Sequence, residues 1–213
     1  MNIAIKQMKT LTVFRATYLE KVVQNNNYNL ISGGTPRGGT SILGLLMKYF
    51  EFEMGKVHPT VYEDLDFHGV EVANWPELVK RKCKEMPGWS VKMPIATSCL
   101  SAFEQSCPMP VFLIIIRNPF SVSKSLIKHD PEYSSDEASY IKGMREALVN
   151  YNNFISELSS LSSPYIIVEH EKIMNSPKCF VSELVEVLNI KVDDEKIAQA
   201  VSLISRPGYK SIN

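Results

Sequence analysis

Short runs of hydrophobic residues alternate along the chain with longer segments in which hydrophobic residues recur every three or four positions. The clearest run, residues 111–116, is apolar throughout and mostly β-branched, as in a strand covered on both faces. Runs at 28–31, 89–92 and 164–168 predict further strands. Because helical segments separate these strands, we expect an α/β fold, a three-layer sandwich with a central, mostly parallel sheet. The expected organisation is a single domain over residues 1–213.

The helical segments are predicted from periodicity and from residues typical of helix ends. In the opening segment, residues 5–22, apolar side chains are spaced as in an amphipathic helix that packs on the body. Ser176 and Pro177 are typical of an N-cap and a first helical position. Between residues 51 and 87, prolines and glycines predict short helices and loops. The other predicted helices are 42–50, 120–128, 136–158 and 193–206.

Composition narrows the class of protein. The chain has 213 residues, of which 45% are hydrophobic and 22% charged, within the globular range. The formal net charge is zero, which argues against a broad nucleic-acid-binding surface. No apolar run is long enough for a signal peptide or a membrane span, so we expect a cytoplasmic protein. The four cysteines are irregularly spaced, so neither a structural zinc site nor a disulfide framework is expected.

A glycine-rich segment, GGTPRGGTS at 33–41, lies between a predicted strand and a predicted helix. A loop of this kind presents backbone N–H groups to an anion at the positive end of the helix dipole. The alternative is a tight turn that requires positive φ angles. In the anion-binding interpretation, the contacting residues are Pro36, Arg37, Gly38, Gly39, Thr40 and Ser41.

The same loop differs from the ATP- and GTP-binding version at one position. In the pattern GxxxxGK[ST] a lysine reaches the β- and γ-phosphates, and here that position holds Gly39. A basic residue stands instead inside the loop, at Arg37. There it would point across a bound phosphate towards a group attached to it. This arrangement favours a nucleotide that carries one 5′-phosphate and a transferable group over a magnesium-bound triphosphate.

The strongest predicted strand ends in a cation. NTPases usually end a second strand with an aspartate near the metal, whereas residues 111–116 are followed by Arg117. A guanidinium at the carboxyl end of a parallel strand lies at the ligand edge of the sheet and can clamp a phosphate. Ser125 follows about two helical turns later and could face the same anion. Taken alone, Arg117 could form a surface salt bridge and Ser125 could lie on a solvated helix face.

These segments resemble the PAPS-dependent sulfotransferase family, where PAPS is 3′-phosphoadenosine 5′-phosphosulfate. GTPRGGTSIL at 34–43 resembles the family's 5′-phosphosulfate loop, and IIIRNPFSVSKS at 114–125 resembles its 3′-phosphate motif. WSVKMP at 89–94 and HEKI at 170–173 are similar to two further family segments. The matches follow the family order and imply a P-loop NTPase-like fold.

The sequence also departs from the family pattern. Gly38 stands where the family usually has serine, and His170 stands where it usually has tyrosine. Family members often carry a basic carboxyl-terminal loop over the nucleotide, and Arg206 and Lys210 are the residues that could serve in it.

The resemblance implies a reaction and roles for individual residues. A sulfuryl group would move from PAPS to a hydroxyl or amine, with Arg37 on the leaving-group side and Lys92 on the sulfuryl oxygens. The 3′-phosphate would be bound by Arg117 and Ser125, and the scheme requires no metal.

The general base has three candidates. In the heparan-type branch of the family, a glutamate precedes an aromatic residue in this region, and anchoring on Phe67 selects Asp64, with Glu63 beside it. His68 is the third candidate, because an unperturbed imidazole titrates nearest neutral pH. The alternative is an exposed acidic helix start without a catalytic role.

Two other functions fit the same motifs. A P-loop kinase or NTPase would share the fold, and a non-catalytic relative would bind the nucleotide without turnover. The acceptor stays open among carbohydrates, lipids, small alcohols or phenols and peptide tyrosine, and we expect a small molecule or a carbohydrate.

Overall fold

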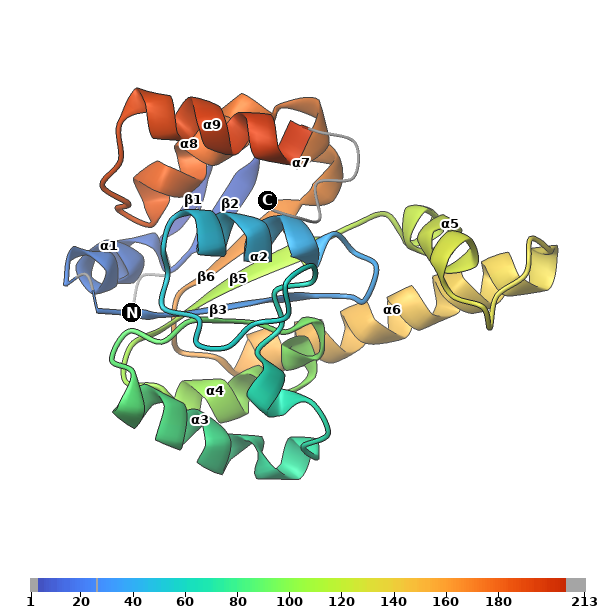
Figure 1. Ribbon diagram of the computed structural model, residues 1–213, viewed down its shortest axis with the longest axis horizontal. Helices are drawn as coiled ribbons and strands as arrows, with labels where there is room; N and C mark the ends of the chain where they lie inside the picture. The colour runs from blue at the N-terminus through green and yellow to red at the C-terminus, as the bar shows by residue number, and fades with distance from the viewer. Residues whose placement is uncertain (1–3, 26, 206–213) are drawn as a thin grey trace.

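A mixed sheet forms the centre of the protein (Figure 1). The computed structural model describes residues 4–25 and 27–205, and within them the sheet has six strands in the order β1-β2-β6-β5-β3-β4. The four neighbouring strands β6, β5, β3 and β4 are parallel. β2 pairs with β6 in the antiparallel sense, and β1 pairs with β2 in the antiparallel sense. The strands are β1 (Ile5–Gln7), β2 (Leu11–Phe14), β3 (Asn29–Gly34), β4 (Val91–Lys92), β5 (Pro110–Ile116) and β6 (Tyr165–Glu169). The predicted α/β class and mostly parallel sheet are therefore confirmed.

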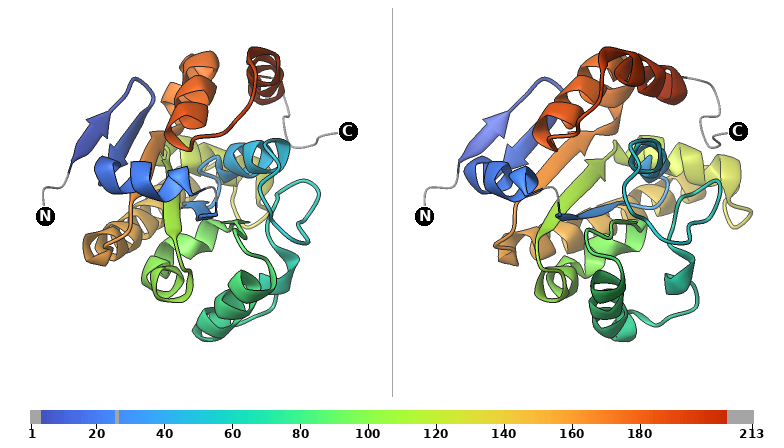
Figure 2. Two further views of the ribbon diagram at one scale, coloured as in Figure 1. Left: turned by 90° about the vertical axis from the view of Figure 1, so that its left-hand side faces the viewer. Right: turned by 60° about the vertical axis from the view of Figure 1, so that its left-hand side comes forward.

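Helices cover both faces of the sheet, which gives the predicted three layers (Figures 1 and 2). One layer contains α1 (Ala16–Gln24), α2 (Thr40–Tyr49), α7 (His170–Asn175), α8 (Pro177–Val187) and α9 (Asp194–Ser205). The other contains α3 (Trp75–Glu85), α4 (Leu100–Ser106) and α6 (Glu137–Ser160), and α5 (Pro119–His129) packs on α6. The described residues also contain three short 3₁₀ helices: Leu65–Phe67, Val72–Asn74 and Pro94–Ser98.

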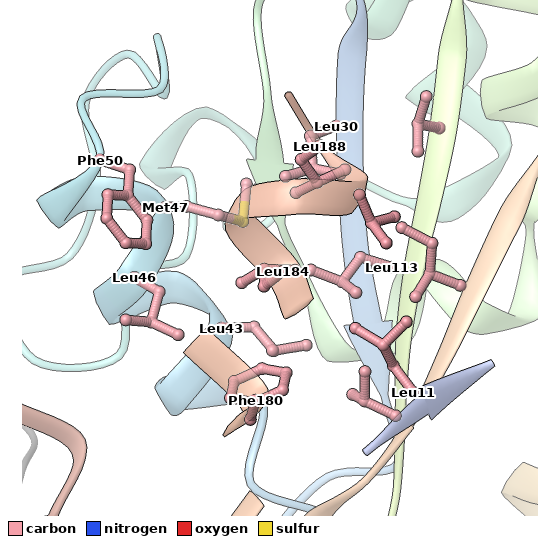
Figure 3. Close-up of a cluster of buried hydrophobic side chains, with 14 of the residues drawn as sticks. Leu11, Leu30, Leu43, Leu46, Met47, Phe50, Leu113, Phe180, Leu184 and Leu188 are labelled. Atoms are coloured by element: carbon pink, nitrogen blue, oxygen red, sulfur yellow. The ribbon is translucent and has the colours of Figure 1, made fainter. Parts of the chain in front are cut away.

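Alternate residues of β5 supply the two hydrophobic clusters. Leu113 and Ile115 join the cluster that includes Leu43 and Phe180 (Figure 3), whereas Phe112 joins the cluster on the opposite face. This is the side-chain period of a strand that is buried on both sides. Burying each such side chain stabilises the fold by about 1.5–3 kcal/mol. The core therefore holds the central strands rigidly, and with them the loops at their ends.

Four aromatic side chains anchor the segment between α2 and β4. The rings of Phe67 and Trp89 stack with centroids 5.9 Å apart, and Phe67 meets Trp75 edge-on at 4.9 Å. Phe103 closes the group from α4. These contacts keep the loop before Phe67 close to the sheet.

The region between residues 51 and 87 was predicted to form short helices and loops. It contains α3, a regular helix of 11 residues, so that prediction was only partly right.

The opening segment is the clearest error of the sequence-based prediction. Instead of one amphipathic helix, residues 5–14 form the hairpin of β1 and β2, and α1 begins at Ala16. Glu183 of α8 accepts hydrogen bonds from the backbone N–H groups of Lys9 and Thr10 and so fixes the turn. The alternating burial of β2 and its pairing with β6 decide the outcome. Both partners are distant in sequence, so the local helical spacing was misleading.

The remaining element predictions are mostly confirmed. Pro177 is the first residue of α8, and Ser176 occupies the N-cap position, although its side chain makes no capping hydrogen bond within the described residues. No helix of the described ranges has both the length and the apolar character needed to cross a bilayer.

Candidate functional site

The carboxyl ends of the parallel strands bring the predicted functional segments to one edge of the sheet. β3 leads into the glycine-rich loop, β5 into Arg117, and β4 ends at Lys92. A cavity of about 500 Å³, here called the edge pocket, opens between these three segments and α5. Ligands of open α/β sheets bind at this edge, because the loops that follow neighbouring strands converge there.

The glycine-rich loop forms one wall of the edge pocket. Pro36, Arg37, Gly39, Thr40 and Ser41 all line the cavity. Gly38 is buried, and its N–H donates to the carbonyl of Thr35 at 2.9 Å, which closes the turn. α2 starts at Thr40, and its N-cap residue, Gly39, has no side chain with which to cap the first backbone N–H groups. A helix N-terminus facing a cavity is suited to an anion.

His170 supports this loop from behind. The backbone of Gly39 has a φ of +96°, and a Cβ there would lie 2.3 Å from Cδ2 of His170. Burial, together with the charge of Arg117, lowers the pKa of His170 to about 4, so the ring is neutral at pH 7. The His170 imidazole therefore acts as a packing surface that only a glycine can approach.

Two arginines and a serine that line the pocket are linked by hydrogen bonds. Nε of Arg37 donates to Oγ of Ser125 at 3.3 Å, and Nη1 of Arg117 donates to the carbonyl of Arg37 at 3.1 Å. Nε of Arg117 is buried and has no hydrogen-bond partner among the described residues. A buried N–H of a charged group without an acceptor is unfavourable. An anionic ligand oxygen would satisfy it.

The position of Arg117 is fixed by neighbouring elements. Its backbone N–H donates to the hydroxyl of Tyr151 on α6 at 2.9 Å, and that hydroxyl donates to the Arg117 carbonyl. The next residue, Asn118, caps α5 by accepting from the N–H groups of Phe120 and Ser121. The guanidinium is thus held at the strand end before any ligand binds.

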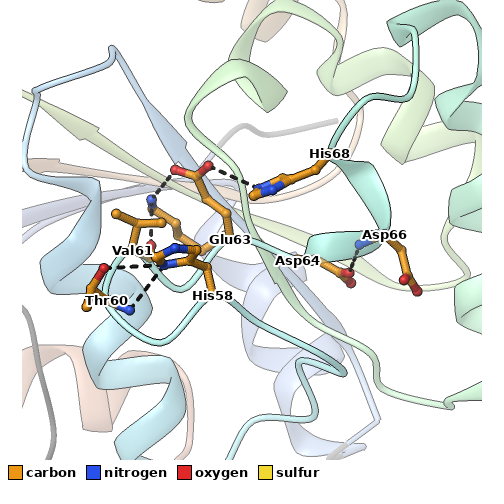
Figure 4. Close-up of polar contacts among 8 residues, drawn as sticks. His58, Thr60, Val61, Glu63, Asp64, Asp66 and His68 are labelled. Atoms are coloured by element: carbon orange, nitrogen blue, oxygen red, sulfur yellow. Dashed lines mark hydrogen bonds and ion pairs between the residues drawn. The ribbon is translucent and has the colours of Figure 1, made fainter.

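Lys92 and Glu63, which both line the pocket, are in direct contact. Nζ of Lys92 lies 2.9 Å from Oε1 of Glu63 and also donates to the carbonyl of Val61 at 2.9 Å (Figure 4). Burial lowers the pKa of Lys92, and the negative charge of Glu63 offsets part of that effect. The second carboxylate oxygen lies 3.7 Å from Nε2 of His68. The site therefore pairs a buried ammonium with a partly accessible carboxylate.

Asp64 lies away from the edge pocket, although its neighbour lines it (Figure 4). The Asp64 side chain is completely buried, and Lys82 approaches it to 3.0 Å. Nε1 of Trp89 and the backbone N–H of Asp66 also donate to it. Burial lowers the pKa of Lys82, but hydrogen bonds with Asp66 and Asp64 outweigh it and leave that pKa raised. This geometry is that of a buried structural ion pair.

The α5 helix contributes cations that the sequence analysis did not single out. Lys124 and Lys128 line the pocket together with Ser121, Ser125 and His129. Positions 121, 124, 125 and 128 share one helical face, so the spacing from Ser125 would have identified both lysines. With Arg37, Lys92 and Arg117, they make the pocket strongly cationic in a protein of zero net charge.

A larger cavity of about 940 Å³ lies at the other end of α2, beside α9. Charged residues of both signs line it, and its Lys196 lies 2.7 Å from Glu51. Its lining has two lysines against three carboxylates, so this cavity lacks the excess of positive charge found in the edge pocket. No group of three or more potential metal ligands occurs in the described part of the chain. Arg206 and Lys210 lie outside the described residues.

Comparison with known proteins identifies solved structures with a similar fold. No protein-family model matches the sequence, and no curated protein matches it. Among solved structures, the sulfotransferase STF9 from Mycobacterium avium gives a TM-score of 0.57 at 11% identity, over 88% of this chain and 72% of its own. The sulfotransferase domain from the curacin biosynthetic pathway gives 0.54 at 14% identity, over 82% and 77%. Mouse sulfotransferase SULT7A1, complexed with PAP, gives 0.50 at 11% identity, over 94% and 76%. The fold therefore resembles a sulfotransferase domain.

Proposed function

We propose that this protein is a PAPS-dependent sulfotransferase. It would transfer a sulfuryl group from PAPS to a hydroxyl or amine of a small-molecule or carbohydrate acceptor and release 3′-phosphoadenosine 5′-phosphate (PAP). The observation that carries the proposal is the buried Nε of Arg117, which has no hydrogen-bond partner among the described residues and belongs to a side chain in contact with Arg37, itself bonded to Ser125. A donor with a phosphate at each end of its ribose needs two anion sites. The glycine-rich loop would supply one anion site, and Arg117 with Ser125 would supply the other.

The donor would be bound by residues of the edge pocket. The N-terminus of α2, with Thr40 and Ser41, suits the 5′-phosphosulfate, because helix N-termini bind anions through backbone N–H groups. Arg117 and Ser125 would bind the 3′-phosphate, and the lysines of α5 would add positive charge around it. The basic residue of the loop, Arg37, would stabilise the charge that develops on the leaving phosphate.

The chain supplies what an in-line transfer requires. Glu63 would take the proton of the acceptor hydroxyl or amine, while the new bond to sulfur forms and the sulfur–oxygen bond to the phosphate breaks. General bases of this kind contribute about 10²–10⁴-fold in rate. Lys92 would stabilise the sulfuryl oxygens. In the structure this ammonium is paired with Glu63, so attraction of Lys92 to the donor would free the carboxylate for the acceptor.

Two features argue for a sulfuryl donor over a triphosphate. Gly39 occupies the position at which NTP-binding loops carry lysine, and β5 is followed by Arg117 where NTPases have an aspartate for magnesium. The residues proposed to contact the donor are cations and hydroxyls, which suit an anion without a bridging metal.

The experiment that tests the proposal is calorimetric titration with PAP, with and without magnesium, using ATP as the comparison ligand. We expect metal-independent binding with a clear preference for PAP. Arg117→Ala should weaken PAP binding about 10–100-fold, since it removes charge-assisted hydrogen bonds. Arg145→Ala, which removes an exposed arginine from α6, is the matched control and should bind normally.

Two results would overturn the proposal. Preference for magnesium-bound ATP would identify a kinase or NTPase. Tight PAP binding without any conversion of PAPS to PAP, tested over a panel of alcohols, phenols and sugars, would identify a non-catalytic relative.

A further inference from the structure

Two cysteines outside the edge pocket are in direct contact. Sγ of Cys83 in α3 lies 3.4 Å from Sγ of Cys107, which follows α4, within hydrogen-bonding distance for two thiols. The two helices pack against each other below the sheet (Figures 1 and 2). A disulfide has an S–S length of about 2.0 Å, so an approach of little more than 1 Å would join the two sulfurs.

The two thiols differ in access and in acidity. Cys83 is half-buried, whereas Cys107 is only 6% exposed. The contact with the sulfur of Cys107 lowers the pKa of Cys83, although burial opposes the effect. The same contact and burial raise the pKa of Cys107. This asymmetry makes Cys83 the thiol that an oxidant meets first and Cys107 the thiol positioned to respond.

The other two cysteines lack this combination. Burial raises the pKa of Cys99 to about 12, and its thiol contacts the carbonyl of Ala96. Cys179 contacts Glu183, and burial and that carboxylate raise its pKa. The thiol with a lowered pKa is therefore also the one that has a second sulfur in contact.

We propose that Cys83 and Cys107 are a site of reversible disulfide formation, with a small-molecule disulfide such as oxidised glutathione as the oxidant. The thiolate of Cys83 attacks one glutathione sulfur, forms a mixed disulfide and expels a glutathione thiolate. Cys107 then attacks the sulfur of Cys83, gives up its proton and releases the second glutathione. The cysteine pair is oxidised and the glutathione disulfide is reduced, so electrons and protons balance.

The disulfide would constrain the segment that carries Lys92. The closed loop runs from Cys83 to Cys107 and contains β4, which ends at Lys92. It also begins one residue after Lys82, the partner of Asp64. A loop of this length removes conformational entropy from the unfolded chain, so oxidation should raise Tm by roughly 5–10 °C. The inference does not depend on the proposed reaction.

The test is incubation of the full chain with oxidised glutathione, followed by alkylation of free thiols and non-reducing peptide mapping. We expect a crosslinked peptide that joins Cys83 to Cys107, together with the rise in Tm, and both should disappear on reduction. Cys83→Ser should abolish the crosslink. Cys107→Ser should leave glutathione attached to Cys83. Cys179→Ser is the control and should form the crosslink like the unaltered chain.

Three results would overturn the proposal. In the chain without substitutions, the first is a glutathione adduct that persists on Cys83. The second is a crosslink between any other pair of cysteines, and the third is four thiols that remain unreacted.

Discussion

Nζ of Lys92 and Oε1 of Glu63 lie 2.9 Å apart inside the edge pocket, and the side chain of the lysine is only 1% exposed. The contact joins a strand end to a loop that lies far from it in sequence. It also explains which of two adjacent acidic residues can act on a ligand. The carboxylate paired with Lys92 lines the cavity, whereas that of Asp64 is enclosed by the protein.

Replacing Glu63 tests its assignment as the general base. Glu63→Gln keeps the size of the side chain but removes the carboxylate, so kcat for PAPS turnover should fall about 10²–10⁴-fold. Binding of PAP should change little, because the residue would act on the acceptor. The measurement is release of PAP from PAPS, in water and with acceptors, beside calorimetry with PAP. Glu71→Gln, at an exposed position, is the control, and equal turnover in both variants would remove Glu63 from the mechanism.

Gly39 should not tolerate a side chain. Gly39→Ala introduces a Cβ at a φ of +96° and 2.3 Å from the His170 ring, so the free energy of unfolding should fall by about 1–3 kcal/mol. Gly69→Ala separates the two causes, since Gly69 has a φ of +76° with no described heavy atom within 4 Å of the added Cβ. Urea denaturation should show the smaller loss there. Adding His170→Ala should recover the clash component of Gly39→Ala, and strict additivity of the two changes would contradict this explanation.

Stability should decrease as the pH falls from about 6.5 to about 4. Burial lowers the pKa of His170 to about 4 from its model-compound value of 6.5, so the unfolded chain binds a proton in this window that the folded chain does not. The free energy of unfolding should therefore fall by at most about 1.4 kcal/mol per pH unit from this group. Chemical denaturation at several pH values measures the slope, and His170→Gln should reduce it. An NMR titration that gives His170 an ordinary pKa would disprove the assignment.

The buried pair of Lys82 and Asp64 should be important for stability. Lys82→Met leaves the Asp64 carboxylate buried without its cation and should cost about 3–5 kcal/mol. Lys80→Met on the same helix removes an exposed ion pair with Glu77 and should cost less than about 1 kcal/mol. Thermal and urea unfolding compare the variants. The double change Lys82→Met with Asp64→Asn should be milder than Lys82→Met alone. A stable Asp64→Asn variant without PAPS turnover would instead point to a catalytic role for that residue.

Local sequence signals predicted the central elements well. The apolar run of β5, the glycine turn before α2 and the proline at the start of α8 depend on burial pattern and backbone chemistry within a few residues. The placement of Arg117 and Ser125 near each other was also predictable, because Arg117 follows the end of β5 and Ser125 lies about two turns into the next helix. Arg37 contacts Ser125 because the loop after β3 and the helix after β5 begin at the same edge of the sheet.

The choice of a proposed base and the opening hairpin depended on residues far along the chain. Glu63 and Asp64 are chemically similar neighbours, and anchoring on Phe67 selected Asp64, whereas the structure places Glu63 at the pocket and buries Asp64. Lys92 approaches one and Lys82 the other, from β4 and from α3. In the same way, β2 is a strand because β6 offers it an edge and Glu183 fixes its turn.

The sequence by itself determined the α/β class, the parallel strands, the glycine-rich loop and the cation at the end of β5. These depend on side-chain periodicity and on residues adjacent along the chain, where geometry is set by the backbone. Only the tertiary structure decided that Glu63 faces the pocket, that His170 packs on Gly39 and that Cys83 meets Cys107. Each of these contacts joins elements whose mutual position results from packing around the shared core, and no local pattern encodes that position.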